Sequence, residues 1–168
     1  MLDRTRVQVD VFLSVGSNIA PEQNLRLVCR ELSGDYGNLT LSSVYKNEAV
    51  GFEGPDFLNM VIGLSTIEEP ERIFARIERL HEQAGRNRHD DPFSSRTLDL
   101  DVLLYGDLVK HQLKLPHEDI EKYSFVLGPL AEVAPELRHP VSGKAMSELW
   151  DGFDQAIHPL QKVDIGIL

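Results

Sequence analysis

The order of strand-like and helix-like segments over the first 105 residues is the strongest constraint on the fold. Strands place apolar residues in alternation or in short runs between glycine and proline, whereas helices repeat them every three to four positions. The segments are a strand over 7–15, a helix from Pro21, strands over 39–45 and 57–64, a helix from Pro70 and a strand over 97–105. This order predicts a ferredoxin-like βαββαβ core, an α+β fold with helices on an antiparallel sheet.

The last of these strands carries two carboxylates. Because side chains alternate across a strand, Asp99 and Asp101 share one face, about 7 Å apart. The opposite face is predicted to hold the apolar residues Leu98, Leu100, Val102 and Leu104. Two ionised carboxylates repel one another unless a cation neutralises them, and a hard divalent ion prefers oxygen ligands. An edge strand with one solvated face is the alternative interpretation of the same pair.

Cationic side chains precede this strand. Arg86, Arg88 and Arg96 flank a polar segment that also contains Asp90 and Asp91. Arginine offers a planar fork of donors that suits phosphate oxygens. The acidic neighbours also allow ordinary ion pairs in a solvated loop. A cationic segment that leads directly into a carboxylate-bearing strand favours a site for a metal-bound polyphosphate.

The overall charge argues against two classes of function. The chain has 168 residues and a formal net charge of −10, so it lacks the basic character that nucleic acids and anionic membranes require. No apolar run is long enough to span a bilayer, and the first residues have no apolar signal core. Cys29 is the single cysteine, which fits a cytoplasmic protein.

The chain beyond residue 106 is predicted to be a C-terminal extension of the same domain. It contains a short segment over 112–115, a helix over 125–133 and a short helix over 146–150, and its last residues are expected to lie over the surface. Because no linker divides the chain, we expect one domain over residues 1–168.

Several further side chains are candidates for a site, each with a structural alternative. His117 is either structural or a hydrogen-bond donor to a phosphate oxygen. Asn59 lies in an apolar strand, where its amide either holds a loop or binds the edge of a heterocycle. Phe93 and Phe125 either pack in the core or clamp a flat ring.

Short motifs follow one another along the chain at characteristic spacings. They are Gly16-Ser17-Asn18 with Asn24-Leu25, Ser43-Val44-Tyr45, Val50-Gly51, Phe57-Leu58-Asn59, Gly85-Arg86-x-Arg88, Arg96-Thr97-Leu98-Asp99-Leu100-Asp101, Leu115-Pro116-His117 and Phe125-Val126-Leu127-x-Pro129-Leu130. Each is weak alone, but their order and spacing are specific. Together, from about residue 9 to residue 140, they resemble the 6-hydroxymethyl-7,8-dihydropterin pyrophosphokinase family of folate biosynthesis.

The resemblance implies a reaction as well as the ferredoxin-like fold. The pterin hydroxymethyl oxygen attacks the β-phosphorus of ATP, the pyrophosphoryl group moves as one unit, and AMP leaves. Two Mg²⁺ ions would bridge the ATP phosphates and be held by Asp99 and Asp101. The expected partners are therefore ATP and a small pterin, with no nucleic acid and no membrane, and we expect a monomer.

The resemblance also implies roles for individual residues. The catalytic residues would be Arg86, Arg96, Asp99 and Asp101. The nucleotide and its phosphates would be contacted by Arg86, Arg88, Arg96, Val102 and His117. The pterin pocket would be formed by Asn47, Val50, Gly51, Phe57, Asn59, Phe93 and Phe125. No strong general base is evident, and this type of transfer depends on positioning and electrostatics instead.

Some positions depart from the family's pattern. The motif Arg-Trp-Gly-Pro-Arg is here 92–96, Pro-Phe-Ser-Ser-Arg, so one arginine is missing. His81 stands where a glutamate is usual, and Tyr123 stands where an arginine is usual. We expect Lys114 to replace part of the lost positive charge at the nucleotide. We therefore predict an active enzyme whose turnover is slower than that of a standard member.

Two other interpretations remain open from the sequence. A catalytically degenerate relative would bind pterin or nucleotide in a regulatory role. The missing arginines favour it, whereas the retained Arg96, Asp99, Asp101 and His117 argue against it. A ferredoxin-like interaction module would need no metal site, so the aspartate pair beside the arginine-rich segment argues against it.

Overall fold

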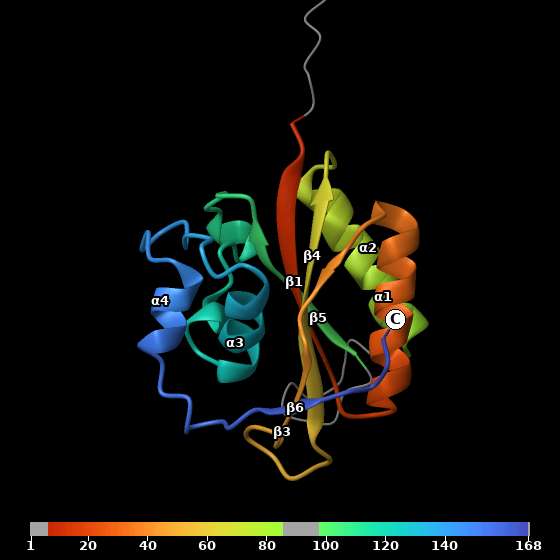
Figure 1. Cartoon of the computed structure of the whole chain (residues 1–168). Coiled ribbons are helices and arrows are strands. Elements are labelled where there is room, and N and C mark those ends of the chain that lie inside the picture. Colours follow the sequence, from red (N-terminus) through yellow and green to blue (C-terminus); the bar gives the residue numbers. More distant parts are fainter. Residues whose placement is uncertain (1–6, 86–97, 168) are drawn as a thin grey trace, which may run out of the picture.

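An antiparallel sheet forms the middle layer of the protein (Figure 1). The computed structural model describes residues 7–85 and 98–167. Its elements are β1 (Val9–Ser17), α1 (Pro21–Tyr36), β2 (Thr40–Leu41), β3 (Val44–Asn47), β4 (Phe57–Thr66), α2 (Pro70–Gln83), β5 (Asp99–Tyr105), the 3₁₀ turns η1 (His111–Leu113) and η2 (Glu118–Ile120), α3 (Ser124–Val133), α4 (Met146–Asp151) and β6 (Gln161–Val163).

The strand order confirms the predicted α+β fold. The order is β5-β1-β4-β3-β6, with β2 paired to β4, and each of these pairs is antiparallel. The central pair runs in register from Val9 opposite Thr66 to Ser17 opposite Leu58. The sheet is therefore ferredoxin-like, and β5, the strand of the two aspartates, lies at one edge.

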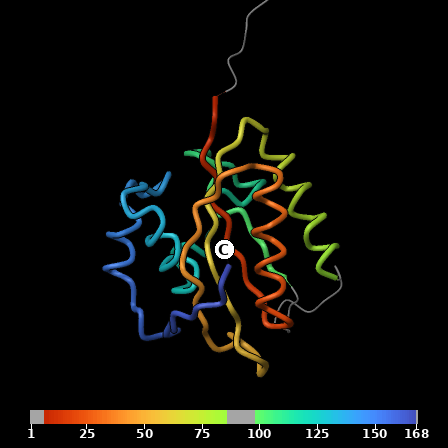
Figure 2. Tube along the Cα trace, turned by 45° about the vertical axis from the view of Figure 1, so that its right-hand side comes forward, coloured from red at the N-terminus to blue at the C-terminus, as the bar shows by residue number. Residues whose placement is uncertain are grey.

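Helices cover both faces of the sheet. Figures 1 and 2 show α1 and α2 on one side and α3 and α4 on the other. The larger core cluster joins Leu13 and Met60 of the sheet to the apolar stripes of α1 and α2. The second cluster joins Val61 and Leu103 to α3 and α4. Each helix thus buries the apolar face that its residue spacing predicts.

The alternation along β5 holds only in its first half. Val102 pairs with Leu13 but Leu104 pairs with Phe12, so the register shifts by one residue and the strand bulges at Leu103. Leu104 consequently joins Leu103 in the cluster beneath α3, and its predicted place beside Leu100 and Val102 was wrong. Asp99 and Asp101 precede the bulge and share the face toward α3, as predicted.

The single strand predicted over 39–45 is in fact two strands, β2 and β3. The backbone N–H of Ser42 donates to the Val61 carbonyl at 3.0 Å. In return, the Val61 N–H donates to the Ser42 hydroxyl at 2.8 Å rather than to a main-chain carbonyl. A side chain therefore replaces one rung of the ladder and separates the two strands.

The last residues of the chain are more ordered than expected. They form β6, which pairs with β3 at the edge of the sheet opposite β5. Beyond it, Ile165 is buried, and its carbonyl accepts a hydrogen bond from the Arg26 guanidinium. The extension thus covers an edge that would otherwise expose unpaired backbone groups.

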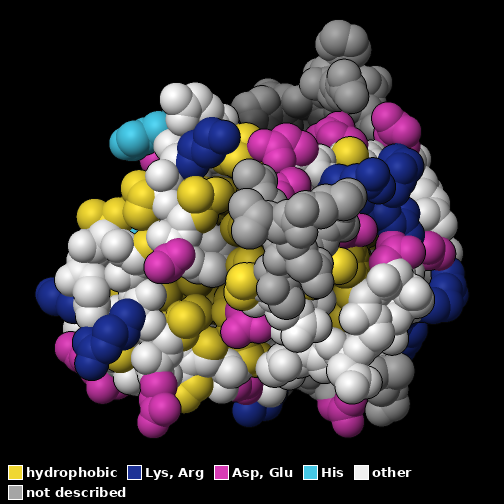
Figure 3. All heavy atoms as spheres, turned by 90° about the horizontal axis from the view of Figure 1, so that it is seen from above, with side chains coloured by type: hydrophobic (Ala, Val, Ile, Leu, Met, Phe, Trp, Pro, Cys, Tyr) yellow, Lys and Arg dark blue, Asp and Glu magenta, His cyan; other side chains and the backbone are white. Residues whose placement is uncertain are grey.

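Charged side chains of both signs lie on the surface. On the face seen in Figure 3, Lys and Arg side chains lie beside Asp and Glu side chains. No helix in residues 7–85 and 98–167 combines the length and the apolarity needed to cross a membrane.

Glu132 on α3 connects that helix to β3. Its carboxylate accepts hydrogen bonds from the Ser43 hydroxyl at 2.7 Å, the Ser43 N–H and the Tyr45 hydroxyl at 3.0 Å, and lies 3.7 Å from the Lys162 ammonium. Burial by itself would raise the pKa of Glu132, but these donors outweigh it and lower the pKa. The ionised carboxylate therefore stabilises the fold at pH values above the pKa that Glu132 has in the unfolded chain. This contribution is lost as the pH falls through the lower pKa of the folded state.

Glu132→Gln is expected to lower the free energy of unfolding at pH 7 by about 1 kcal/mol, because an amide accepts these bonds more weakly on a partly exposed side chain. The difference from the unmodified protein should shrink as the pH falls below the usual glutamate range, where both side chains are neutral. Urea unfolding of both proteins at neutral and at acidic pH measures this difference in the free energy of unfolding. An equal difference at both pH values would contradict the assigned role of the charge.

Candidate active site

A cavity of about 320 Å³ lies between the α3 side of the sheet and the start of α3. This volume is typical of a site for a small molecule. Strands β1, β3, β4 and β5 form its floor, and the residues from η2 to α3 form its wall. The predicted residues that line it are Asn47, Val50, Phe57, Asn59, Asp99, Asp101 and Phe125. The fold thus brings both carboxylates and most of the predicted pterin residues to one place.

Aromatic rings from two different elements form one part of the cavity. Phe125, in the first turn of α3, stacks on Tyr123 with ring centroids 4.9 Å apart and planes 17° apart. Phe57 on β4 meets Phe52 edge-on, with centroids 6.2 Å apart. These contacts fix the orientation of Phe57 and Phe125, and the cavity between such surfaces suits a flat ring.

Two buried amides lie beside these rings. The Asn59 amide nitrogen donates to the Asn47 side-chain oxygen, and the Asn47 nitrogen donates to the Glu48 carbonyl at 3.0 Å. Asn59 is opposite Gly16 in the β1–β4 register, and a Cβ atom at Gly16 would lie only 2.6 Å from Asn59 Oδ1. The glycine therefore leaves room for the amide, which is held in one orientation beside the cavity.

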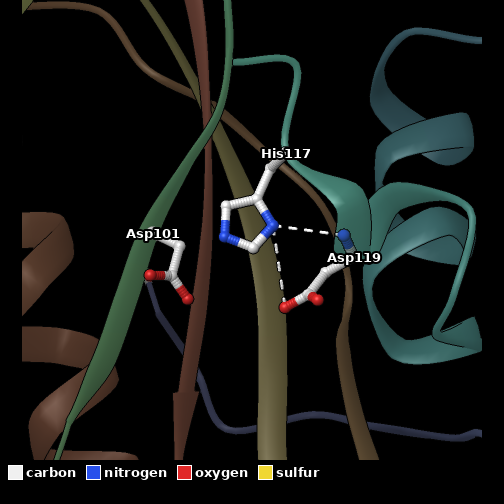
Figure 4. Close-up of side chains that lie close together, drawn as sticks. All are labelled: Asp101, His117 and Asp119. Atoms are coloured by element: carbon white, nitrogen blue, oxygen red, sulfur yellow. Dashed lines mark hydrogen bonds and ion pairs between the residues drawn. The ribbon is translucent and has the colours of Figure 1, made fainter. Parts of the chain in front are cut away.

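Asp101, His117 and Asp119 form a polar cluster at the other part of the cavity, which Asp101 and Asp119 line. Figure 4 shows Asp101 on β5, His117 just before η2 and Asp119 within η2 pointing toward one another, and their ligand atoms lie within 4.8 Å of one another. The His117 backbone N–H donates to the Leu103 carbonyl at 2.9 Å, which fixes the histidine beside β5. Burial raises the pKa of Asp119 above the usual aspartate range.

The hydrogen bonds of His117 indicate which nitrogen carries its proton. Its Nδ1 accepts the Asp119 backbone N–H at 3.1 Å, so in the neutral ring the proton is on Nε2. An Nε2–H group donates to an anion and cannot ligate a cation. Carboxylate oxygens are what a hard divalent ion prefers, so Asp99 and Asp101 fit Mg²⁺, and His117 fits a phosphate oxygen.

His81 supports the peptide between the two aspartates. Its Nε2 accepts the Leu100 backbone N–H at 3.0 Å, and only 6% of the residue is exposed. Among the described strands β5 lies at the edge of the sheet, so no strand there accepts this N–H. His81 therefore connects α2 to the strand that carries Asp99 and Asp101.

His81→Leu is expected to lower the free energy of unfolding by about 1–3 kcal/mol, because the buried Leu100 N–H loses its acceptor. It should also raise the Mg²⁺ concentration needed for half-maximal activity. His81→Gln keeps an acceptor and should recover part of both losses. Urea unfolding and a Mg²⁺ titration measure the two effects, and a leucine variant with unchanged stability would refute the role of this hydrogen bond.

Of the other predicted residues, His117 lies beside Asp101 and Asp119 but is not among the residues that line the cavity. Three more lie away from it. Gly51 lies in the loop between β3 and β4, in the left-handed backbone region at φ 84°. Val102 is 2% exposed and packs on the opposite face of β5. Lys114 is exposed in the turn after η1. The predicted residues Arg86, Arg88, Phe93 and Arg96 lie outside the described residues.

Other residues line the cavity although the sequence did not single them out as site residues. They are Ser14, Val15, Gly16, Phe52, Glu118, Asp119, Lys122, Tyr123 and Val126. Asp119 follows the predicted residue His117 by two positions, and the His117 side chain accepts its backbone N–H at the start of η2. The others reach the cavity only through the packing of distant elements.

Comparison with known proteins identifies the family. Residues 12–135 match the family described as 7,8-dihydro-6-hydroxymethylpterin-pyrophosphokinase (HPPK). The 2-amino-4-hydroxy-6-hydroxymethyldihydropteridine pyrophosphokinase of Aquifex aeolicus is 32% identical over 142 residues, which cover 82% of this chain and 88% of the relative. The Porphyromonas gingivalis protein of the same name is 36% identical over 138 residues, covering 77% and 93%.

Solved structures agree on the fold. A Plasmodium falciparum HPPK-DHPS variant solved with pterin superimposes with a TM-score of 0.68 at 12% identity, covering 92% of this chain and 46% of that chain. This chain thus spans just under half of that longer protein. Taken with the family match and the identities to curated relatives, these findings show that the chain belongs to the 7,8-dihydro-6-hydroxymethylpterin-pyrophosphokinase family.

Proposed function

We propose that the cavity binds a pterin beside Mg-ATP and catalyses pyrophosphoryl transfer. As a pyrophosphokinase of this family, the chain transfers pyrophosphate from ATP to the hydroxymethyl group of 6-hydroxymethyl-7,8-dihydropterin, in folate biosynthesis. The observation that carries the proposal is the composition of one cavity, in which aromatic rings and amides adjoin two strand carboxylates.

The aromatic part of the cavity is proposed to hold the pterin. A flat ring with polar edges fits between Phe57 and Phe125, which come from β4 and α3. The amides of Asn47 and Asn59 are fixed by their mutual hydrogen bond and offer polar atoms to the ring edge. Val50 and Gly51, in the loop after β3, are proposed to complete this side through their backbone.

The carboxylate part is proposed to hold the metal and the phosphates. Asp99 and Asp101 would ligate two Mg²⁺ ions, which would offset the charge that develops on the bridging and leaving oxygens of ATP. The His117 Nε2–H group would donate to a phosphate oxygen. This arrangement would orient the pterin hydroxymethyl oxygen toward the β-phosphorus, so that positioning and electrostatics would supply most of the catalysis.

The remaining nucleotide contacts are proposed from the sequence. Arg86, Arg88 and Arg96 would bind phosphate oxygens, with Arg86 and Arg96 contributing to catalysis, and Phe93 would close over the pterin. Because the Val102 side chain is buried on the other face of β5, its contact with the nucleotide would be made by its backbone. Lys114 would have to approach the nucleotide from outside the cavity.

We further propose that residues 1–168 act as one domain and as a cytoplasmic monomer. The packing of α3, α4 and β6 on the same sheet as the βαββαβ core supports the single domain. The single buried cysteine is compatible with a reducing compartment.

ATP labelled at its β-phosphorus provides a direct test. Incubated with Mg²⁺, 6-hydroxymethyl-7,8-dihydropterin and the protein, it should give a labelled pterin product and unlabelled AMP. Stabilisation of the protein by the pterin without any labelled product would instead favour the degenerate relative that binds without chemistry. The predicted slow turnover is tested by the single-turnover rate at saturating Mg-ATP, which should fall below that of a standard family member.

A further inference from the structure

The charges that line the cavity are strongly unbalanced. Its acidic residues are Asp99, Asp101, Glu118 and Asp119, and among the described lining residues Lys122 is the one cation. A nucleoside triphosphate adds several more negative charges to the same space. Two Mg²⁺ ions would offset only part of that charge, so a cationic side chain on the cavity wall has a clear electrostatic role.

Lys122 is well placed on that wall. It follows η2 and precedes α3, and its backbone N–H donates to the Asp119 carbonyl at 3.2 Å. Its ammonium lies 5.5 Å from the centre of the Tyr123 ring. In the sequence, Lys122 thus lies between the carboxylates of Glu118 and Asp119 and the stacked rings of Tyr123 and Phe125.

Within the part of the chain that the structure describes, no carboxylate holds the Lys122 ammonium in an ion pair, whereas Lys46 and Lys162 each have one. The long side chain can move a few ångströms at little cost, and an ammonium is a strong hydrogen-bond donor to phosphate oxygens.

We propose that Lys122 contacts the phosphate oxygens of the nucleotide bound in the cavity and supplies positive charge during pyrophosphoryl transfer. This inference rests on the proposed function of the cavity. It assigns to Lys122 the compensating role that the sequence suggested for Lys114, whose side chain lies outside the cavity.

Lys122→Ala is expected to lower kcat/KM for Mg-ATP by about tenfold to a hundredfold, the typical effect of losing a charged hydrogen bond. Lys122→Arg should retain most of the activity because it keeps the charge. The shift in melting temperature that the pterin alone produces should stay unchanged in both variants. Lys144→Ala, which removes an exposed lysine from the turn before α4, is the matched control and should behave as the unmodified protein.

Three results would overturn the assignment. They are unchanged kinetics in Lys122→Ala, an equal loss in the arginine variant, and a loss in Lys114→Ala that Lys122→Ala does not show. The unmodified protein is assayed first for pterin-dependent AMP. If it makes none, the proposed function fails, and calorimetric binding of Mg²⁺ with the methylene analogue of ATP then tests Lys122 alone: weaker binding in Lys122→Ala would support the contact, and equal binding would refute it.

Discussion

Asp101→Asn is expected to reduce turnover by about a hundredfold to a thousandfold, the effect of losing a metal ligand worth several kcal/mol of transition-state stabilisation. Asp99→Asn should have an effect of the same order. The two side chains share the face of β5 that forms the cavity, and the hydrogen bond from Leu100 to His81 supports the strand between them. Steady-state AMP formation, measured over a range of Mg²⁺ concentrations, gives the size of the loss.

Asp107→Asn is the matched control for both variants, because Asp107 is exposed in the turn that follows the same strand. It should leave turnover unchanged, so any general effect of removing a carboxylate from this region would be detected. Chelation of Mg²⁺ should abolish the activity of the unmodified protein. Near-normal turnover in both Asp99→Asn and Asp101→Asn would refute the metal site.

Gly16→Ala is expected to raise KM for the pterin by about tenfold to a hundredfold. The loss of one buried polar contact typically weakens ligand binding by a factor of this size. The added Cβ atom would lie 2.6 Å from Asn59 Oδ1, which is too close. The Asn59 amide must then move away from its position beside Asn47 and Phe57. KM for ATP should change much less, since the clash is on the pterin side of the cavity.

Gly34→Ala is the control for the glycine substitution. It adds the same methyl group on the exposed side of α1, where no atom lies within 4 Å. It should leave both KM values unchanged and stabilise the protein by about 0.5–1 kcal/mol. An unaltered KM for the pterin in Gly16→Ala would show that Asn59 does not bind the pterin in the proposed way.

Much of the fold was predictable because local sequence patterns determine it. The alternation in the strands, the apolar stripes of α1 and α2 and the prolines at their starts place these elements correctly, and their order predicts the sheet. The parts that were not predictable depend on partners far away in the chain. β6 forms only because β3 offers an edge more than a hundred residues earlier, and the bulge at Leu103 appears only in the pairing with β1.

The site was predictable to the extent that its residues belong to motifs. Asn59, Asp99, Asp101 and Phe125 were expected and do meet in one cavity. Lys122 carries no sequence signal, since a lysine between two elements is usually a solvated side chain. Its place beside the carboxylates results from the way that η2 and α3 pack against β5, and no pattern within a short segment encodes such packing.

The release of AMP from Mg-ATP, measured with and without 6-hydroxymethyl-7,8-dihydropterin, tests the central claim most directly. The account predicts AMP in an amount that depends on the pterin and matches the pyrophosphorylated product, with no ADP, because the pyrophosphoryl group moves as one unit. Formation of ADP, or AMP release that does not depend on the pterin, would contradict it.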